Sequence, residues 1–189
     1  MYRASQEHVT EHAVFRVPRR EYANKRRTPM LANRLIQLIE NHSKSLTHAV
    51  VHDIETSEHT RGFRKVPKEE LGPRVAATYE NLGRWIANPN EDAIRQEYED
   101  WGRTRFRQGI PFSELIYVLM LIKKHLRQFI KEHGLVDFSG DRVTPEEFIP
   151  MQLYAIQELN YQVGDFFDRA LYYLVRGHEA AAAAHLATV

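Results

Sequence analysis

Apolar side chains return at steps of three and four residues along most of this sequence, which is the spacing of one face of an α-helix. The pattern predicts five helices, at residues 28–59, 68–87, 91–108, 111–133 and from about 144 to beyond 177. No segment has the pattern of a strand bounded by turn residues. The predicted fold class is therefore all-α, a five-helix bundle with long first and last helices.

Glycine, proline and capping residues mark the ends of these helices. Asn90 is placed to cap the third helix, and Gly109 followed by Pro111 separates the third helix from the fourth. Gly134 ends the fourth helix, and Thr144 is a suitable cap for the fifth. The segment between residues 102 and 116 is thus predicted to be a corner between two helices.

The chain divides into three parts by composition. Residues 1–27 form a basic N-terminal arm that we expect to be poorly ordered, because a short cationic terminus is usually solvated. Residues 28–179 form the predicted helical domain. Residues 180–189 are an alanine-rich tail, which we expect to continue the last helix because alanine is the best helix former.

Charge and cysteine content exclude several classes of protein. The formal net charge is only +1, so the chain as a whole does not require nucleic acid or an acidic membrane as a partner. There is no cysteine, which excludes disulfides and thiolate metal sites and favours a cytoplasmic location. The longest apolar run, Leu115–Ile122, is too short to span a bilayer. Nucleic-acid binding by the basic arm stays a minor hypothesis.

Two histidines are candidate ligand-binding residues. His42 lies in the apolar stripe between Leu38 and Leu46, and His125 lies at the edge of the stripe of the fourth helix. Either could bind a haem iron or a small ligand inside the bundle. The alternative is that each is a core histidine hydrogen-bonded to a neighbour.

A second group of histidines shares one face of the first predicted helix. His48, His52, Glu55 and His59 follow at steps of four, three and four residues, a spacing that can hold a transition metal. This face is offset from the apolar stripe, so a solvated surface is the favoured interpretation. No nucleophile motif, phosphate-binding loop or converging acid–base set indicates catalysis.

The helix corner carries a resemblance to a known family. The stretch WGRTRFRQGIPFSELIYVLMLIKKHLRQFI, residues 101–130, resembles the N-terminal domain of RsbRD-type co-antagonists of bacterial stress signalling. The stretch FFDRALYYLVRGHE, residues 166–179, is similar to the segment that joins such domains to their output modules. The resemblance implies an all-helical, dimeric sensory or scaffold domain, related in some members to globins that have lost haem. It also implies structural or interface roles for Arg103, Arg105, Gln108, Gly109 and Pro111, with the last helix as signal carrier.

The sequence therefore predicts a non-enzymatic sensory or regulatory domain, without a cofactor, that works as a homodimer with a signalling protein or an output domain. No output domain follows residue 189, so the chain is either a fragment or a freestanding relative. The alternative is a globin-like domain that binds haem or a small ligand through His42 or His125. Pairing of two last helices is predicted to use Ile149, Leu153, Ile156, Asn160, Val163 and Phe167, although the same residues could equally form the core of a single chain.

Overall fold

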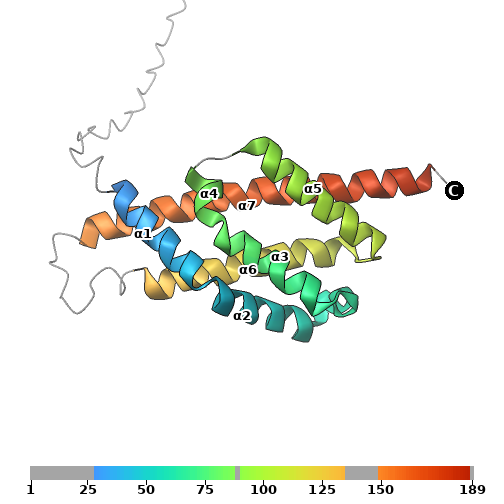
Figure 1. The fold of residues 1–189 in the computed structure, drawn as a ribbon, viewed down its shortest axis with the longest axis horizontal. Coiled ribbons are helices and arrows are strands. Elements are labelled where there is room, and N and C mark those ends of the chain that lie inside the picture. The colour runs from blue at the N-terminus through green and yellow to red at the C-terminus, as the bar shows by residue number, and fades with distance from the viewer. Residues whose placement is uncertain (1–27, 88–89, 135–148, 188–189) are drawn as a thin grey trace, which may run out of the picture.

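The computed structural model describes residues 28–87, 90–134 and 149–187 (Figure 1). In these ranges the chain forms helices and no strand, so the all-α class is confirmed. The elements are α1 (Thr28–Asn41), α2 (Ser43–Thr56), the 3-10 helix η1 (Glu58–Lys65), α3 (Lys68–Glu80), α4 (Leu82–Ala87), α5 (Glu91–Arg107), α6 (Phe112–His133) and α7 (Ile149–Leu186). The basic arm and the predicted start of the last helix at Thr144 lie outside the described residues.

The predicted single helix over residues 28–59 is wrong, because the chain breaks at His42. The backbone of His42 has φ −101° and ψ 10°, which ends α1 and starts α2 in a new direction. A similar break at Asn81, with φ −107° and ψ 9°, separates α3 from α4 within the second predicted helix. The described residues therefore form eight helices instead of five.

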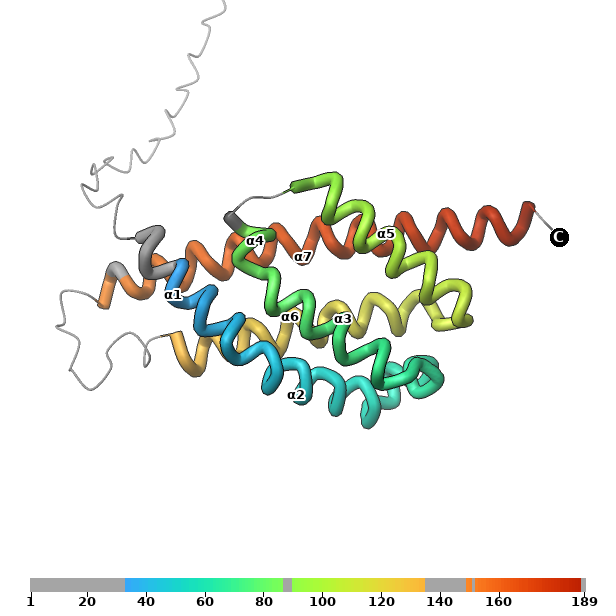
Figure 2. Tube along the Cα trace, in the orientation of Figure 1, coloured from blue at the N-terminus to red at the C-terminus, as the bar shows by residue number. Residues whose placement is uncertain are grey.

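The two longest helices, α6 and α7, run antiparallel and side by side (Figures 1 and 2). α5 packs along α7, and the chain from α5 to α6 turns through the predicted corner. α2 and η1 pack against the other side of α6, while α1 contacts both α6 and α7. The order α2, α6, α7, α5 thus forms a row of helices that α1, α3 and α4 cover from one side.

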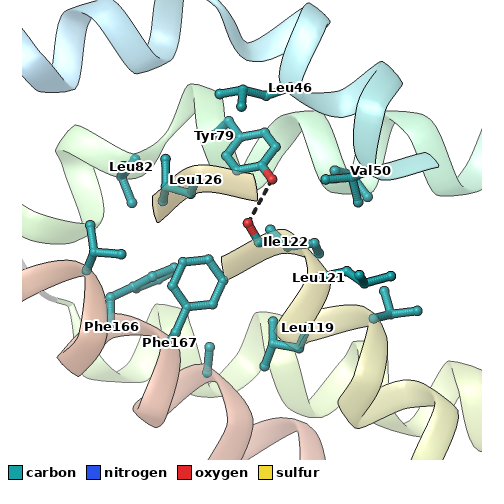
Figure 3. Close-up of a cluster of buried hydrophobic side chains, with 14 of the residues drawn as sticks. Leu46, Val50, Tyr79, Leu82, Leu119, Leu121, Ile122, Leu126, Phe166 and Phe167 are labelled. Carbon is teal, nitrogen blue, oxygen red and sulfur yellow. Dashed lines mark hydrogen bonds between the residues drawn. The ribbon is translucent and has the colours of Figure 1, made fainter. Parts of the chain in front are cut away.

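The core lies between that row and the covering helices (Figure 3). Tyr79 of α3 is fully buried, and its hydroxyl donates a hydrogen bond to the Ile122 carbonyl oxygen at 2.9 Å. Phe166 and Phe167 of α7 pack into the same cluster beside Leu126 of α6. This cluster fixes α7 against the rest of the bundle through its middle third.

Candidate signalling site at the α5–α6 corner and along α7

The helix corner predicted from the sequence is confirmed. α5 ends at Arg107, and Gly109 then adopts φ +68°, the left-handed conformation that glycine reaches without strain. The Ile110 amide donates to the Arg105 carbonyl oxygen at 3.0 Å, which satisfies a terminal carbonyl of the helix. Pro111 then precedes the first residue of α6.

Arg105 lies at the centre of the corner, with only 1% of its side chain exposed. Its Nη1 donates to Glu70 Oε1 at 2.6 Å and also to Gln108 Oε1. The Gln108 amide in turn donates to Glu70 Oε2 at 3.1 Å. The guanidinium carbon lies 5.6 Å from the centre of the Phe63 ring. One buried cation therefore joins η1, α3 and the end of α5.

The charge of Arg105 is held in place by its carboxylate partner. Burial lowers the pKa of Arg105 from its ordinary value, and the nearby Glu70 carboxylate opposes that change. Arginine stays protonated in proteins at neutral pH, so the corner contains a buried positive charge whose main counter-ion is Glu70. The Nε of Arg105 is buried and has no hydrogen-bond partner among the described residues.

α5 and α7 approach each other so closely that two glycines are required. A Cβ added to Gly102 would lie 2.2 Å from the Leu174 carbonyl oxygen, and one added to Gly177 would lie 2.0 Å from the Glu99 carbonyl oxygen. No side chain fits at either position without moving a helix backbone. The two helices are therefore in backbone contact at this crossing.

Polar contacts join α5 to α7 away from the crossing as well. Glu91 at the start of α5 accepts a hydrogen bond from the Tyr173 hydroxyl at 2.6 Å and pairs with Arg169 at 3.0 Å. These donors, with Tyr173 the larger influence, lower the pKa of Glu91. The same hydrogen bond raises the pKa of Tyr173. α7 is thus attached to α5 at the start of α5 as well as at the crossing.

The six residues predicted for pairing of last helices fall in three environments on α7. Ile149 and Leu153 are 40% and 50% exposed, so they are accessible to another molecule. Ile156 and Asn160 are half-buried, and the Asn160 amide donates to the Ile156 carbonyl oxygen. Val163 and Phe167 are buried in the core of their own chain. The structure therefore leaves only the first part of this stripe available for contact.

His42 lies outside the interior that its apolar stripe predicts, whereas His125 lies at the edge of its helix face as expected. His42 is exposed at the break between α1 and α2, where Nδ1 lies 2.8 Å from the Leu38 carbonyl oxygen. The break changes the helical phase, which removes His42 from the interior. His125 is half-buried, and its Nε2 lies 2.8 Å from Asp53 Oδ2 on α2. The haem hypothesis stays open, and a spectral titration with haem would test it.

The second histidine group is also dispersed. His48 and His52 are exposed on α2, whereas His59 lies in η1 and packs against the Tyr117 ring at 5.0 Å. Glu55 is paired with Lys68. Across the parts of the chain that the structure describes, no group of three or more His, Cys, Asp or Glu side chains could hold a metal ion. In the same parts, no helix has both the length and the apolar character needed to cross a bilayer.

The described residues thus define an all-helical domain with a buried arginine at its corner and a last helix that packs against α1, α4, α5 and α6. The family of the RsbT co-antagonist protein rsbRD N-terminal domain matches residues 44–188, and the chain belongs to this family. The match extends from α2 to the end of α7 and includes the corner. Among curated proteins and solved structures, none is significantly similar to the chain. The family suggested by residues 101–130 is therefore confirmed.

Sequence reasoning missed three residues of this site. Glu70 is the counter-ion of Arg105, but an acidic residue at the start of a helix is already explained by the helix dipole, so its sequence position gives no sign of this pair. Gly102 and Gly177 are isolated glycines inside helical patterns, and such glycines often mark a close backbone approach. Their positions were a usable signal, but the sequence does not reveal that the two face each other.

Proposed function

We propose that this chain is a non-enzymatic sensory or regulatory domain of bacterial stress signalling that acts in the cytoplasm by contact with other proteins. Membership of a family named for an RsbT co-antagonist supports this role. α7 is the element that carries the signal, because it contacts α1, α4, α5 and α6 and also continues through the alanine-rich tail to Leu186. A signalling protein, or an output domain attached to α7, is the recipient.

The observation that carries the proposal is the backbone contact of Gly102 and Gly177. Helices that pack backbone to backbone cannot absorb a displacement in flexible side chains, so movement of α5 must move α7. A stimulus that favours one packing of these helices over another shifts a two-state equilibrium, and a bound protein senses that shift.

Two copies associate through the outward side of α7 in this proposal. Ile149 and Leu153 contact the other copy, Ile156 and Asn160 lie at the margin, and Val163 and Phe167 support the helix from its own core. Exposed apolar side chains support this arrangement, since Leu153 is 50% exposed and the neighbouring Tyr154 is 57% exposed.

Sedimentation equilibrium of the full chain tests the association. We expect a dimer for the wild type and a shift towards monomer for Leu153→Glu, because a carboxylate would be buried without a partner. Gln37→Glu is the matched control, since Gln37 is an exposed residue of α1. A wild type that stays monomeric at every concentration would contradict the association.

A further inference from the structure

A cavity of about 520 Å³ lies between α4 and α5. Both helices pack on α7, where they follow one another along its length (Figure 1). We call this cavity the α4–α5 cavity; it is lined by Arg84 and Trp85 of α4 and by residues of α5 that include Ala93, Glu97 and Asp100. Its volume is in the range of pockets that bind small molecules. None of these residues belongs to the Arg105 corner or to the pairing stripe of α7.

The two ends of the α4–α5 cavity are level with different parts of α7. At the α4 end, Trp85 stacks on Phe166 with ring centres 6.1 Å apart. At the other end, Asp100 lies just before Gly102, where α5 meets the Leu174 carbonyl oxygen. The stretch of α7 from Phe166 to Leu174 is about 12 Å long. The cavity is therefore elongated, with its α4 residues and Asp100 at opposite ends.

Arg84 gives the α4 end of the cavity a positive charge without a counter-ion. Its guanidinium carbon lies 4.8 Å from the centre of the Trp85 ring, and it has no ion pair with any other described residue. Trp85 is buried, so its ring is a fixed surface for the guanidinium. The cation is thus already oriented, and its N–H groups remain available to bind a carboxylate.

Asp100 gives the opposite end of the cavity a negative charge without a counter-ion. The other acid of the cavity, Glu97, is already paired, because Arg74 Nη1 donates to its carboxylate at 2.7 Å. Arg74 Nη2 also donates to the Glu97 carbonyl oxygen at 3.3 Å. Asp100 is exposed and forms no ion pair within the part of the chain that the structure describes. One cation on α4 and one carboxylate on α5 are therefore available to a ligand.

We infer that the α4–α5 cavity binds a linear zwitterion, a small molecule in which a short apolar chain joins a carboxylate to an ammonium group. The Arg84 guanidinium donates hydrogen bonds to the ligand carboxylate, and the ligand ammonium group donates to the Asp100 carboxylate. The apolar chain lies beside Trp85 and Ala93. Because the two protein charges lie at opposite ends of the cavity, the ligand charges must be separated by several methylene groups.

The position of Asp100 connects this site to the proposed signal. Asp100 follows Glu99, whose carbonyl oxygen takes part in the backbone contact with Gly177. A ligand that draws Asp100 towards α4 therefore acts on the part of α5 that cannot move without moving α7. The role of the cavity as the input of the signal rests on the proposed function, whereas the binding of a zwitterion does not.

Isothermal titration calorimetry of the full chain with 6-aminohexanoate tests the site. We expect saturable binding of one molecule per chain. Hexanoate lacks the ammonium group and hexylamine lacks the carboxylate, so each should bind at least about tenfold more weakly. Glycine carries both charges but is too short to reach both ends of the cavity, so it should also bind at least about tenfold more weakly.

Two substitutions assign the charges. Arg84→Met and Asp100→Asn each remove one charge and keep a side chain of similar size, and each should raise the dissociation constant of 6-aminohexanoate at least about tenfold. Arg107→Met and Asp92→Asn are the matched controls, because both residues are exposed on α5 and outside the cavity. Circular dichroism checks that each variant keeps the fold, as expected for exposed side chains.

The failures of this inference and of the proposed function are distinguishable. The site is overturned if 6-aminohexanoate shows no saturable binding to the wild type, or if hexanoate, hexylamine or glycine binds as tightly. Unchanged binding by Arg84→Met or Asp100→Asn would also overturn it. These results leave the proposed association of two copies untouched. Binding as expected by a chain that stays monomeric would support the site and contradict the association.

Discussion

Arg105 and Glu70 lie 35 positions apart in the sequence and form an ion pair of 2.6 Å, in which the arginine is buried and the glutamate is 40% exposed. The pair connects the start of α3 to the end of α5. It therefore holds the corner, at which the chain reverses into α6, against the covering helices.

Replacing Glu70 should destabilise the fold by more than the loss of one favourable interaction with the helix dipole. Glu70→Ala leaves the buried Arg105 charge without its main counter-ion, and we expect a loss of about 1–3 kcal/mol in the free energy of unfolding. The lower part of that range allows for solvent screening of the exposed glutamate. Urea denaturation followed by circular dichroism measures the loss.

Glu69→Ala is the matched control for this prediction. Glu69 is an exposed acid in the same first turn of α3, so its loss removes the same favourable interaction with the helix dipole. Equal effects of the two substitutions would mean that the pair with Arg105 contributes nothing measurable.

Adding a methyl group at the α5–α7 crossing should be costly. Gly102→Ala places Cβ 2.2 Å from the Leu174 carbonyl oxygen, so a helix backbone must move. We expect a loss of at least about 2 kcal/mol in the free energy of unfolding, measured by urea denaturation.

Gly164→Ala separates this steric effect from helix propensity. Gly164 also lies inside α7, but its Cβ would meet no atom within 4 Å. Alanine is the better helix former, so this variant should gain up to about 1 kcal/mol. If both alanine variants changed the free energy of unfolding in the same direction, the backbone contact between α5 and α7 would be contradicted.

Alkaline pH should destabilise the fold through its buried tyrosines. Burial raises the pKa of Tyr98 to about 12, and burial also raises the pKa of Tyr79 above its ordinary value. A tyrosine in the unfolded chain ionises near pH 10, so the Tyr98 contribution is complete below about pH 10 and is lost as pH rises towards 12. The expected slope is about 1.4 kcal/mol per pH unit per tyrosine between those values.

Measuring the free energy of unfolding of Tyr98→Phe as a function of pH tests whether Tyr98 causes this loss of stability. Between pH 10 and 12, the free energy of unfolding of this variant should fall less steeply with pH, by about the contribution of one tyrosine. Tyr161→Phe is the matched control, because Tyr161 is 76% exposed. Identical slopes for the wild type and Tyr98→Phe would contradict the assignment.

Local signals predicted the elements around the corner well. Asn90 caps α5 by accepting from the Ala93 amide, and Gly109 and Pro111 separate α5 from α6 where expected. The breaks at His42 and Asn81 could not be predicted in the same way, because neither residue is a glycine or a proline. These breaks depend on how the short helices pack, which is a property of the whole bundle.

Non-local contacts explain what sequence patterns missed at the site. Helical spacing places Arg105 on a different face from Arg103 and Arg107, but a buried arginine is recognised only when its counter-ion on α3 is known. On α7, the first inward residues are Gln152, Ala155 and Leu159, whereas the apolar pattern selected Ile149, Leu153 and Ile156. Small and polar residues face inward there, so hydrophobicity alone does not identify the inward side of this part of α7.

The crossing at Gly177 divides α7 into a long amino-terminal segment and a short carboxyl-terminal segment. About 42 Å of helix precedes this point and about 14 Å follows it up to Leu186. If α7 tilts as a rigid rod about the crossing, its two ends move in opposite directions, and the carboxyl end moves about one third as far as the amino end. The glycine contact is then the pivot of this motion. A large displacement of the amino end of α7 near the covering helices gives a small displacement of its carboxyl end.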